Sequence, residues 1–317
     1  MREARTLTRE FSELVRAAID VGTNSVLLLV AEIHPDPTST APLRVLYEAE
    51  SVTRLGEAVH GSELLQPEAI SRTIQAVGAF AREARLRGAA DLRIVATSAV
   101  REAKNAQDFL AAVEREIGER VEVLSGADEA RAAFRGVLAG VAREVEGELL
   151  VIDVGGGSTE LVVGGDRPHQ WVSLDIGTVR LSELALKHDP YLPHEWHEVR
   201  GLIRRHLQRV SFDNRHPSKV VGVGGTITTL GMLQLGLTEY SAKALHGARL
   251  SVRQIDGWAE RLAGLTVAQR RRLRGVPPLR ADVLPVGAAI FAEVLQHFGR
   301  DELEISTYGI RHGILLG

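Results

Sequence analysis

The chain has no cysteine in its 317 residues. This absence excludes disulfide bonds, cysteine-ligated zinc, iron–sulfur clusters and thiol nucleophiles. No stretch reaches about 18 consecutive apolar residues, so we expect no transmembrane helix. The first 16 residues are charged and lack the apolar segment of a secretory signal peptide. We therefore expect a cytoplasmic protein that does not associate with membranes.

The chain also lacks a large excess of either charge. It has 38 Lys and Arg residues against 41 Asp and Glu residues, a formal net charge of −3. This balance argues against a nucleic-acid-binding protein, and a polyanionic substrate would need a local basic patch. The contents of 44% apolar and 25% charged residues are ordinary for a soluble protein. At about 150 residues per domain, the length predicts two domains.

One segment of the chain occurs twice. Residues 19–30 read IDVGTNSVLLLV and residues 152–163 read IDVGGGSTELVV, with seven of twelve positions identical. The two copies are 133 residues apart, which is about the length of one domain. We interpret the repeat as two domains of one design.

Each copy predicts a strand, a tight turn and a second strand. The turn is either a plain hairpin turn or a phosphate cradle without a lysine, built from backbone N–H groups and short polar side chains. We expect positive φ at Gly22 and Gly155, and N–H groups open to an anion at Gly156 and Gly157. The candidate phosphate-binding residues are Gly22, Thr23, Asn24 and Ser25 in the first copy and Gly155, Gly156, Gly157, Ser158 and Thr159 in the second.

A third glycine loop lies in the segment VVGVGGT at residues 220–226. A strand is expected to run into this loop and a helix to begin near Thr226, so Gly224, Gly225 and Thr226 are further phosphate-binding candidates. The segment is not a dinucleotide-binding fingerprint, because Ile227 stands where the third glycine would be. It is not a Walker loop either, because no lysine follows.

Periodicity and capping signals predict a mixed sheet with helices on its faces in each half. Asn105 with Asp108 resembles a capping box, and Ser125 with Asp128 caps the next helix. Strands are expected at residues 92–99, 121–126, 149–164 (a hairpin), 170–176, 219–223 and 303–310. Helices are expected at residues 66–87, 105–117, 127–142, 180–187, 195–209, 226–235, 251–263 and 280–297.

Several segments together resemble the exopolyphosphatase and guanosine pentaphosphate phosphohydrolase (Ppx/GppA) family of the actin, Hsp70 and sugar-kinase superfamily. In order, they are AAIDVGTNSVLLLV, TSAVREAKN, LSGADEAR, VIDVGGGSTELVVG, VGVGGTITTL, RADVLPVGAAI and STYGIRHGILL. The resemblance implies an α/β fold of two ribonuclease-H-like (actin-like ATPase) domains with the active site in the cleft between them. The chain matches the short two-domain form, with domains at 14–130 and 131–317, although the last helical turns are free to pack back on the first domain.

The resemblance also implies a reaction, which is hydrolysis of the terminal phosphoanhydride of inorganic polyphosphate by metal-assisted attack of water. Guanosine pentaphosphate is the alternative substrate, Mg²⁺ or Mn²⁺ the implied cofactor, and a homodimer the implied assembly. Two other readings stay open. One is a phosphotransferase of the sugar- or acetate-kinase type, with residues 220–231 binding ADP, and the other is a non-catalytic phosphate or nucleotide sensor.

Carboxylates supply the candidates for metal binding and for activating water. Asp153 ends a buried strand and either ligates the metal or caps its turn. Glu160 lies across the same hairpin, facing either the solvent or the cleft, where the resemblance places it at the metal and the water. Asp20 mirrors Asp153 and either faces the metal through water or caps its own turn. Glu129 matches the family's general base, although an acid there, like Asp128, also complements the helix dipole.

Arginines supply the remaining candidates. Arg101 either binds phosphate bidentately or forms a surface ion pair with Glu102 or Asp108. Arg311 is either an arginine of the cleft or a residue of a helix surface. The basic stretch at residues 200–209 is either a track for a long polyphosphate chain or a solvated helix face.

Overall fold

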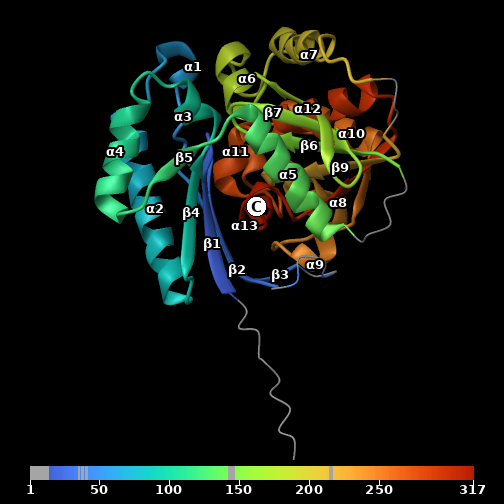
Figure 1. The fold of residues 1–317 in the computed structure, drawn as a ribbon. Helices are drawn as coiled ribbons and strands as arrows, with labels where there is room; N and C mark the ends of the chain where they lie inside the picture. Colours follow the sequence, from blue (N-terminus) through green and yellow to red (C-terminus); the bar gives the residue numbers. More distant parts are fainter. Residues whose placement is uncertain (1–13, 35, 37–38, 40–41, 142–146, 214–216) are drawn as a thin grey trace, which may run out of the picture.

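The protein, described here by a computed structural model, is built around two separate β-sheets (Figure 1). The structure describes residues 14–34, 36, 39, 42–141, 147–213 and 217–317. Most of the N-terminal stretch used in the signal-peptide argument lies outside these residues, as does residue 142 at one predicted helix end. In Figure 1 the first half of the chain, in blue and teal, lies beside the second half, in green to red.

The first sheet has the strand order β3-β2-β1-β4-β5. β1 pairs with β2 and β2 with β3 in antiparallel fashion, whereas β4 and β5 continue the sheet in parallel with β1. The strands are β1 (Leu14–Val21), β2 (Ser25–Ile33), β3 (Leu43–Val52), β4 (Asp91–Ala96) and β5 (Val121–Val123). The helices of this half are α1 (Val59–Ser62), α2 (Pro67–Leu86), α3 (Ser98–Glu102) and α4 (Ala106–Ile117).

The second sheet has the order β10-β11-β9-β6-β7-β8. From β8 to β11 its order and strand directions repeat those of the first sheet from β3 to β5, and β10 is added at the edge. Its strands are β6 (Leu149–Val154), β7 (Thr159–Gly164), β8 (Pro168–Leu174), β9 (Lys219–Val223), β10 (Arg249–Ser251) and β11 (Glu302–Ile305). The shared topology agrees with the repeated sequence segment, and it confirms the predicted α/β class.

The remaining helices follow or cover the second sheet. They are α5 (Gly126–Gly140), α6 (Thr178–Ala185), α7 (Pro193–Leu207), α8 (Gly225–Leu235), α9 (Ala242–Leu245), α10 (Val252–Ala263), α11 (Val267–Arg270), α12 (Leu284–His297) and α13 (Ile310–Leu315), with a short 3₁₀ turn η1 at Pro278–Arg280. In the described part of the chain, no helix combines the length and the apolar character that crossing a membrane requires.

Apolar side chains cover both faces of each sheet. Alternate residues of β1 point to opposite faces, so Ile19 packs toward α2 and Ala18 toward α13. In β6, Ile152 packs toward α12 and Val151 toward α5. The layers therefore run from α2 through the first sheet to α13 and α5, and from there through the second sheet to α12 and α7.

Helices α5 and α13 cross closely between the two sheets. A Cβ atom at Gly136 of α5 would overlap the Gly309 carbonyl, and one at Gly313 of α13 would overlap the Ala132 carbonyl. Only glycine permits this approach. Although α5 begins in the first predicted domain, it packs on the second sheet, and α13 at the end of the chain packs on the first.

Most predicted elements are present, with informative exceptions. Ser125 caps α5 by accepting the Asp128 N–H, as predicted. Asn105 does not cap α4, because its side chain bonds instead to both backbone groups of Leu65. The predicted strand at 303–310 ends at Ile305, where the chain turns into the loop before α13. The predicted helix at 280–297 begins at Leu284, after the η1 turn.

Candidate active site

A cavity of about 690 Å³ lies where the strand ends of the two halves meet, and we call it the central cavity. Residues that follow β1, β4, β6, β9 and β11 all line it. Loops at the carboxyl ends of parallel strands commonly form binding sites in open α/β sheets. The central cavity is therefore the candidate active site, and it receives residues from both halves.

The two repeated turns have the same backbone geometry. In the first, the Gly22 N–H donates to the Ser25 carbonyl at 2.9 Å, and in the second the Gly155 N–H donates to the Ser158 carbonyl at 3.0 Å. The predicted strand–turn–strand is thus present twice. The predicted positive φ at Gly22 and Gly155 is wrong, because neither is among the positive-φ glycines, whereas Gly224 has φ of 94°.

Glycine is required in the second turn because the two halves touch there. A Cβ atom at Gly156 would lie 2.9 Å from Cβ of Thr23, and one at Gly157 would overlap the Ser98 hydroxyl. Thr23 and Ser98 both belong to the first half. The two turns therefore contact each other, and both line the central cavity.

Asp153 and Glu160 are directly opposite each other in the β6–β7 hairpin, and both line the central cavity. The Ser173 hydroxyl donates to Glu160 at 2.8 Å. Loss of solvation, with the charge of Glu129, raises the pKa of Asp153 from 3.8 to about 7. Burial raises the pKa of Glu160 well above its usual value, with contributions from the charges of Glu129 and Asp153. In the first copy, the residue opposite Asp20 is Leu27, so only the second hairpin carries this pair.

Glu129 lies in the first turn of α5, buried and on the wall of the central cavity. Arg101 Nη1 donates to its carboxylate at 2.9 Å. Burial raises the pKa of Glu129, and Arg101 opposes that rise. The neighbouring Asp128 is outside the cavity lining, where it accepts from the Ser125 hydroxyl at 2.6 Å and from Arg131 at 2.9 Å. These bonds hold the pKa of Asp128 below its usual value.

Asp20 is the buried carboxylate of the first half. It is 7% exposed, and its Oδ1 atom has no hydrogen-bond partner among the described residues. Burial raises its pKa from 3.8 to about 7, with contributions from Glu129 and Asp153 and partial opposition from Arg311. An unpartnered buried carboxylate oxygen is costly. A cation in the central cavity would relieve that cost.

The carboxylates fit a divalent metal ion that takes its other ligands from the substrate and from water. Within the described ranges, no three or more His, Asp or Glu side chains are grouped to hold a metal by themselves. Mg²⁺ nonetheless binds commonly through one or two carboxylates together with substrate phosphates and water. Asp20, Asp153 and Glu160 offer oxygen ligands of this kind around one cavity.

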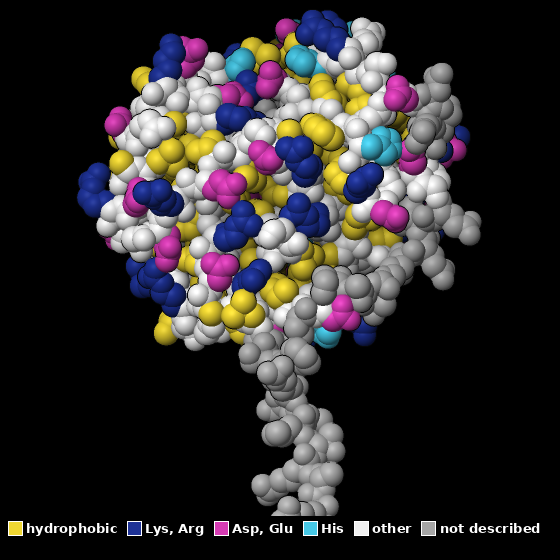
Figure 2. Space-filling view, viewed as in Figure 1, with side chains coloured by type: hydrophobic (Ala, Val, Ile, Leu, Met, Phe, Trp, Pro, Cys, Tyr) yellow, Lys and Arg dark blue, Asp and Glu magenta, His cyan; other side chains and the backbone are white. Residues whose placement is uncertain are grey.

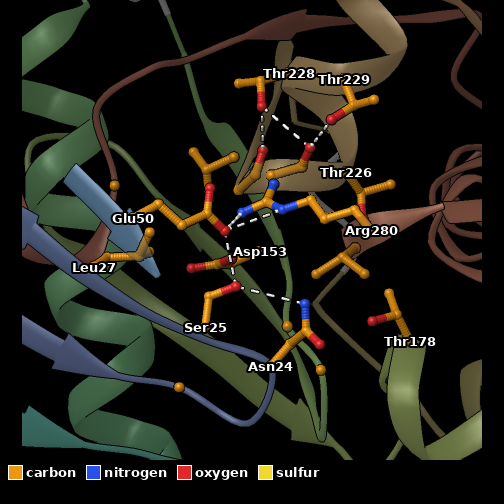
Figure 3. A pocket seen from close by; sticks show the side chains of 18 of the residues that line it. Asn24, Ser25, Leu27, Glu50, Asp153, Thr178, Thr226, Thr228, Thr229 and Arg280 are labelled. Atoms are coloured by element: carbon orange, nitrogen blue, oxygen red, sulfur yellow. Dashed lines mark hydrogen bonds and ion pairs between the residues drawn. The ribbon is translucent and has the colours of Figure 1, made fainter. Parts of the chain in front are cut away.

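The third glycine loop also lines the central cavity, at the N-terminus of α8. The Arg280 side chain lies over it, since a Cβ atom at Gly225 would overlap the guanidinium. Figure 3 shows Arg280 extending to Glu50 of the first half. Arg280 donates to Glu50 from Nε at 3.1 Å and also from Nη2, and the Ser25 hydroxyl donates to Glu50 at 2.8 Å.

The remaining predicted residues fall into two groups. Arg311 lines the central cavity, where it donates to the Leu28 carbonyl at 2.6 Å and to Glu48 at 2.9 Å. Two others are absent from the described lining. Thr159 is fully buried and donates to the Ile176 carbonyl, and Arg101 is held by Glu129 rather than by the predicted Glu102 or Asp108. All other predicted site residues line the cavity.

Two arginines of the basic stretch at residues 200–209 are paired with acids. Arg200 bonds to Asp256, Glu260 and the buried Glu293, and Arg204 bonds to Glu293. None of the residues from 200 to 209 lines the central cavity. In Figure 2 basic and acidic side chains are interspersed over the described part of the visible face, without a continuous basic band.

Sequence reasoning missed several residues of the cavity wall. Thr97 and Ser98 follow β4 within the segment TSAVREAKN, so their position at the end of a predicted strand could have identified them as site residues. Glu48 and Glu50 lie on β3, and Arg280 lies in a turn. No local motif marks Glu48 and Glu50. Arg280 begins the segment RADVLPVGAAI, but that segment does not single it out as a site residue, because the position of all three depends on how the two halves pack.

Comparison with known proteins finds a matching family, similar sequences and similar structures. A sequence model described as the Ppx/GppA phosphatase family matches residues 30–317. The chain is 35% identical over 311 residues to exopolyphosphatase 2 of Mycobacterium tuberculosis, covering 95% of this chain and 97% of that protein. The crystal structure of the Aquifex aeolicus Ppx/GppA family member has a TM-score of 0.79 at 35% identity, over 96% of both chains. An exopolyphosphatase from Cytophaga hutchinsonii has a TM-score of 0.86 at 26% identity, over 95% and 96% of the two chains.

These matches confirm the resemblance found in the sequence and the actin-like two-sheet fold that it implies. They extend over nearly the whole chain and over nearly the whole of the relatives. The chain belongs to the Ppx/GppA phosphatase family.

Proposed function

We propose that the chain hydrolyses the terminal phosphoanhydride of inorganic polyphosphate and releases phosphate. One observation carries the proposal: two glycine turns in contact and four carboxylates from both halves line a single cavity. The turns offer backbone N–H groups to phosphate oxygens, and the carboxylates offer metal ligands and a base. The name of the Mycobacterium tuberculosis relative, exopolyphosphatase 2, supports this choice of substrate.

In this proposal, each group of the site has a defined task. The N–H groups of the two turns bind and orient the terminal phosphates. Glu129 accepts the proton of the attacking water, and its raised pKa makes it a stronger base than a free glutamate. Thr97 and Arg101 orient its carboxylate through hydrogen bonds.

Asp20, Asp153 and Glu160 would hold Mg²⁺ or Mn²⁺ together with the phosphate oxygens of the substrate. When bound, such an ion neutralises phosphate charge and lowers the pKa of its water. The raised pKa values of Asp20 and Asp153 support this role, because a nearby cation would offset the burial that raises them. Cytoplasmic location and a homodimer remain predictions.

Phosphate release from long polyphosphate, short polyphosphate and guanosine pentaphosphate tests the proposal when measured side by side. We expect release from polyphosphate with Mg²⁺ and none in excess EDTA. Full turnover in EDTA would contradict the metal site. The absence of release from any of the three substrates, with the metal present, would contradict the hydrolase assignment.

One observation favours guanosine pentaphosphate as the second candidate. The central cavity extends beyond the glycine turns to a wall that includes Met232, Tyr240, Val276 and Pro277. Such a wall suits a flat organic ring better than it suits a phosphate chain. A kcat/KM for guanosine pentaphosphate above that for polyphosphate would select this candidate over the first.

A further inference from the structure

Two arginines line the central cavity among the described residues, and each is paired with a glutamate of β3. Arg311 bonds to Glu48, and Arg280 bonds to Glu50. The same wall also carries Asp20, Glu129, Asp153, Glu160 and Glu239. A polyanionic substrate thus meets a cavity with more carboxylates than arginines, in which both arginines are already occupied.

The two arginines differ in how they are held. Arg311 lies on α13 between the sheets and is anchored by the Leu28 carbonyl as well as by Glu48. Arg280 lies in the η1 turn, and the described hydrogen bonds of its side chain go to Glu50. Its guanidinium lies against the N-terminus of α8, the positive end of the helix dipole. A cation at this position needs an anion beside it, and Glu50 provides that charge.

Glu50 also binds a group of the first glycine turn. The Ser25 hydroxyl donates to the same oxygen, Oε1, that accepts from Arg280. One carboxylate oxygen therefore joins a donor of the first half to an arginine above the third glycine loop. A phosphate oxygen at that point would accept from the same two donors (Figure 3).

We propose that Glu50 is a specificity-determining residue that occupies the place of a substrate phosphate, and that the substrate must displace it from Arg280 and Ser25. This inference rests on the proposed function. It predicts that Glu50 weakens the binding of every polyphosphate, because its carboxylate competes with phosphate for both donors. Because of this competition, a ligand with enough negative charge to replace the Glu50 carboxylate binds in preference to a singly charged anion.

A neighbouring ion pair provides a matched control. Arg54 of the first half bonds to Asp282 at 2.7 Å, just beyond Arg280 on the same turn. This pair also joins the two halves, but neither residue lines the central cavity. If Glu50→Gln acts only by loosening the contact between the halves, Asp282→Asn should have the same effect. If Glu50 competes with phosphate for Arg280 and Ser25, only Glu50→Gln should strengthen binding.

The experiment measures the Kd of non-hydrolysable imidotriphosphate by calorimetry, together with KM and kcat for polyphosphate. We expect Glu50→Gln to lower Kd and KM by about three- to tenfold, with kcat within twofold. Asp282→Asn should leave both constants within about twofold. In an Arg280→Gln background the gain from Glu50→Gln should fall below about twofold, because Arg280 is the charged one of the two donors and only the Ser25 hydroxyl remains to be competed for.

Three results would overturn the inference. They are an unchanged or higher Kd in Glu50→Gln, an equal effect of Asp282→Asn, or a gain that persists at full size in the Arg280→Gln background. The last result would mean that Glu50 acts by simple repulsion. A protein that binds imidotriphosphate but releases no phosphate from polyphosphate would contradict the proposed function instead, and the comparison of Kd values would still decide the role of Glu50.

Discussion

Glu129 and Asp128 are adjacent carboxylates of one helix turn with different surroundings. Glu129 is buried at the central cavity beside Arg101, whereas Asp128 bonds to Ser125 and Arg131 outside it. The residue pattern by itself does not separate them, since either acid complements the helix dipole, and it was the family resemblance that favoured Glu129 as the base. Only the direction of each side chain separates them, and that direction is fixed by the packing of α5 against the second sheet.

We predict that Glu129→Gln nearly abolishes turnover, because the amide keeps the shape of the side chain but cannot accept a proton. A positioned general base contributes about 10²- to 10⁴-fold to the rate. Asp128→Asn should keep most of the activity and lose about 1 kcal/mol of stability, because it weakens the cap of α5. The measurements are kcat for polyphosphate and thermal unfolding. Equal and modest losses of activity in both variants would mean that Glu129 only stabilises the helix and is not the base.

Asp20 allows a prediction about stability and pH in the metal-free protein. Its pKa is raised from 3.8 to about 7 in the folded state, so folding favours the protonated acid. The stability that this proton contributes is present below pH 3.8 and is lost as the pH rises through about 7. Asp20→Asn should therefore be more stable than the unsubstituted chain at pH 8 in EDTA, by at most about 4 kcal/mol.

Chemical unfolding of both proteins at pH 5 and pH 8 checks this prediction. The difference in unfolding free energy should be larger at pH 8, and Mg²⁺ should stabilise the unsubstituted chain more than the variant. A variant that is less stable at pH 8 in EDTA would show that the carboxylate of Asp20 is already compensated within the protein.

At the scale of elements, the sequence predicts strands and helices well where a single periodic segment determines them. The two IDVG hairpins and α2 lie where the patterns place them. The errors occur where long-range packing decides the outcome. Asn105 bonds to Leu65 instead of capping α4, and residues 306–309 leave the sheet to line the central cavity. Neither arrangement has a local signal.

The crossing of α5 and α13 gives a prediction for helix packing. Gly136→Ala introduces a methyl group that overlaps the Gly309 carbonyl, so it should separate the two helices and cost about 1–3 kcal/mol. Gly257→Ala in α10 is the matched control, because no atom of the described residues lies within 4 Å of the place its methyl group would take. That variant should gain up to about 1 kcal/mol from the helix preference of alanine. Thermal unfolding measures both, and a neutral Gly136→Ala would mean that the crossing is loose.

At the scale of the whole molecule, the sequence repeat predicts two similar halves, and the two sheets share their strand order. The cavity between them was expected from the resemblance, and most of its predicted residues line it. The contacts that join the halves could not be predicted. Arg280 and Glu50 are 230 positions apart in the sequence, and Arg180 of the second half bonds to Glu102 of the first. Such pairs depend on the relative placement of the two sheets.

The basic stretch on α7 gives the last prediction, which concerns how a long chain would reach the cavity. A polyphosphate track requires free arginines that lead to the site, but no residue from 200 to 209 lines the central cavity, and Arg204 shares the buried Glu293 with Arg200. The variant Arg204→Ala/Arg205→Ala/Arg209→Ala should therefore change KM equally for long and short polyphosphate. It should also lose about 1 kcal/mol of stability, because Glu293 keeps only one of its two arginines.

Kinetics with long chains and with tripolyphosphate, at low and high salt, distinguish the two roles. If these arginines form a track, their removal raises KM for the long chain alone. The rise is larger at low salt, because exposed charges are screened as salt increases. Glu198→Gln on the same helix is the control for a change of charge that removes no arginine. If KM for the long chain rises selectively in the triple variant, these arginines guide the substrate although Arg204 is paired with Glu293. If it does not, chain-length preference is set inside the central cavity, where Glu50 and Glu48 face Arg280 and Arg311.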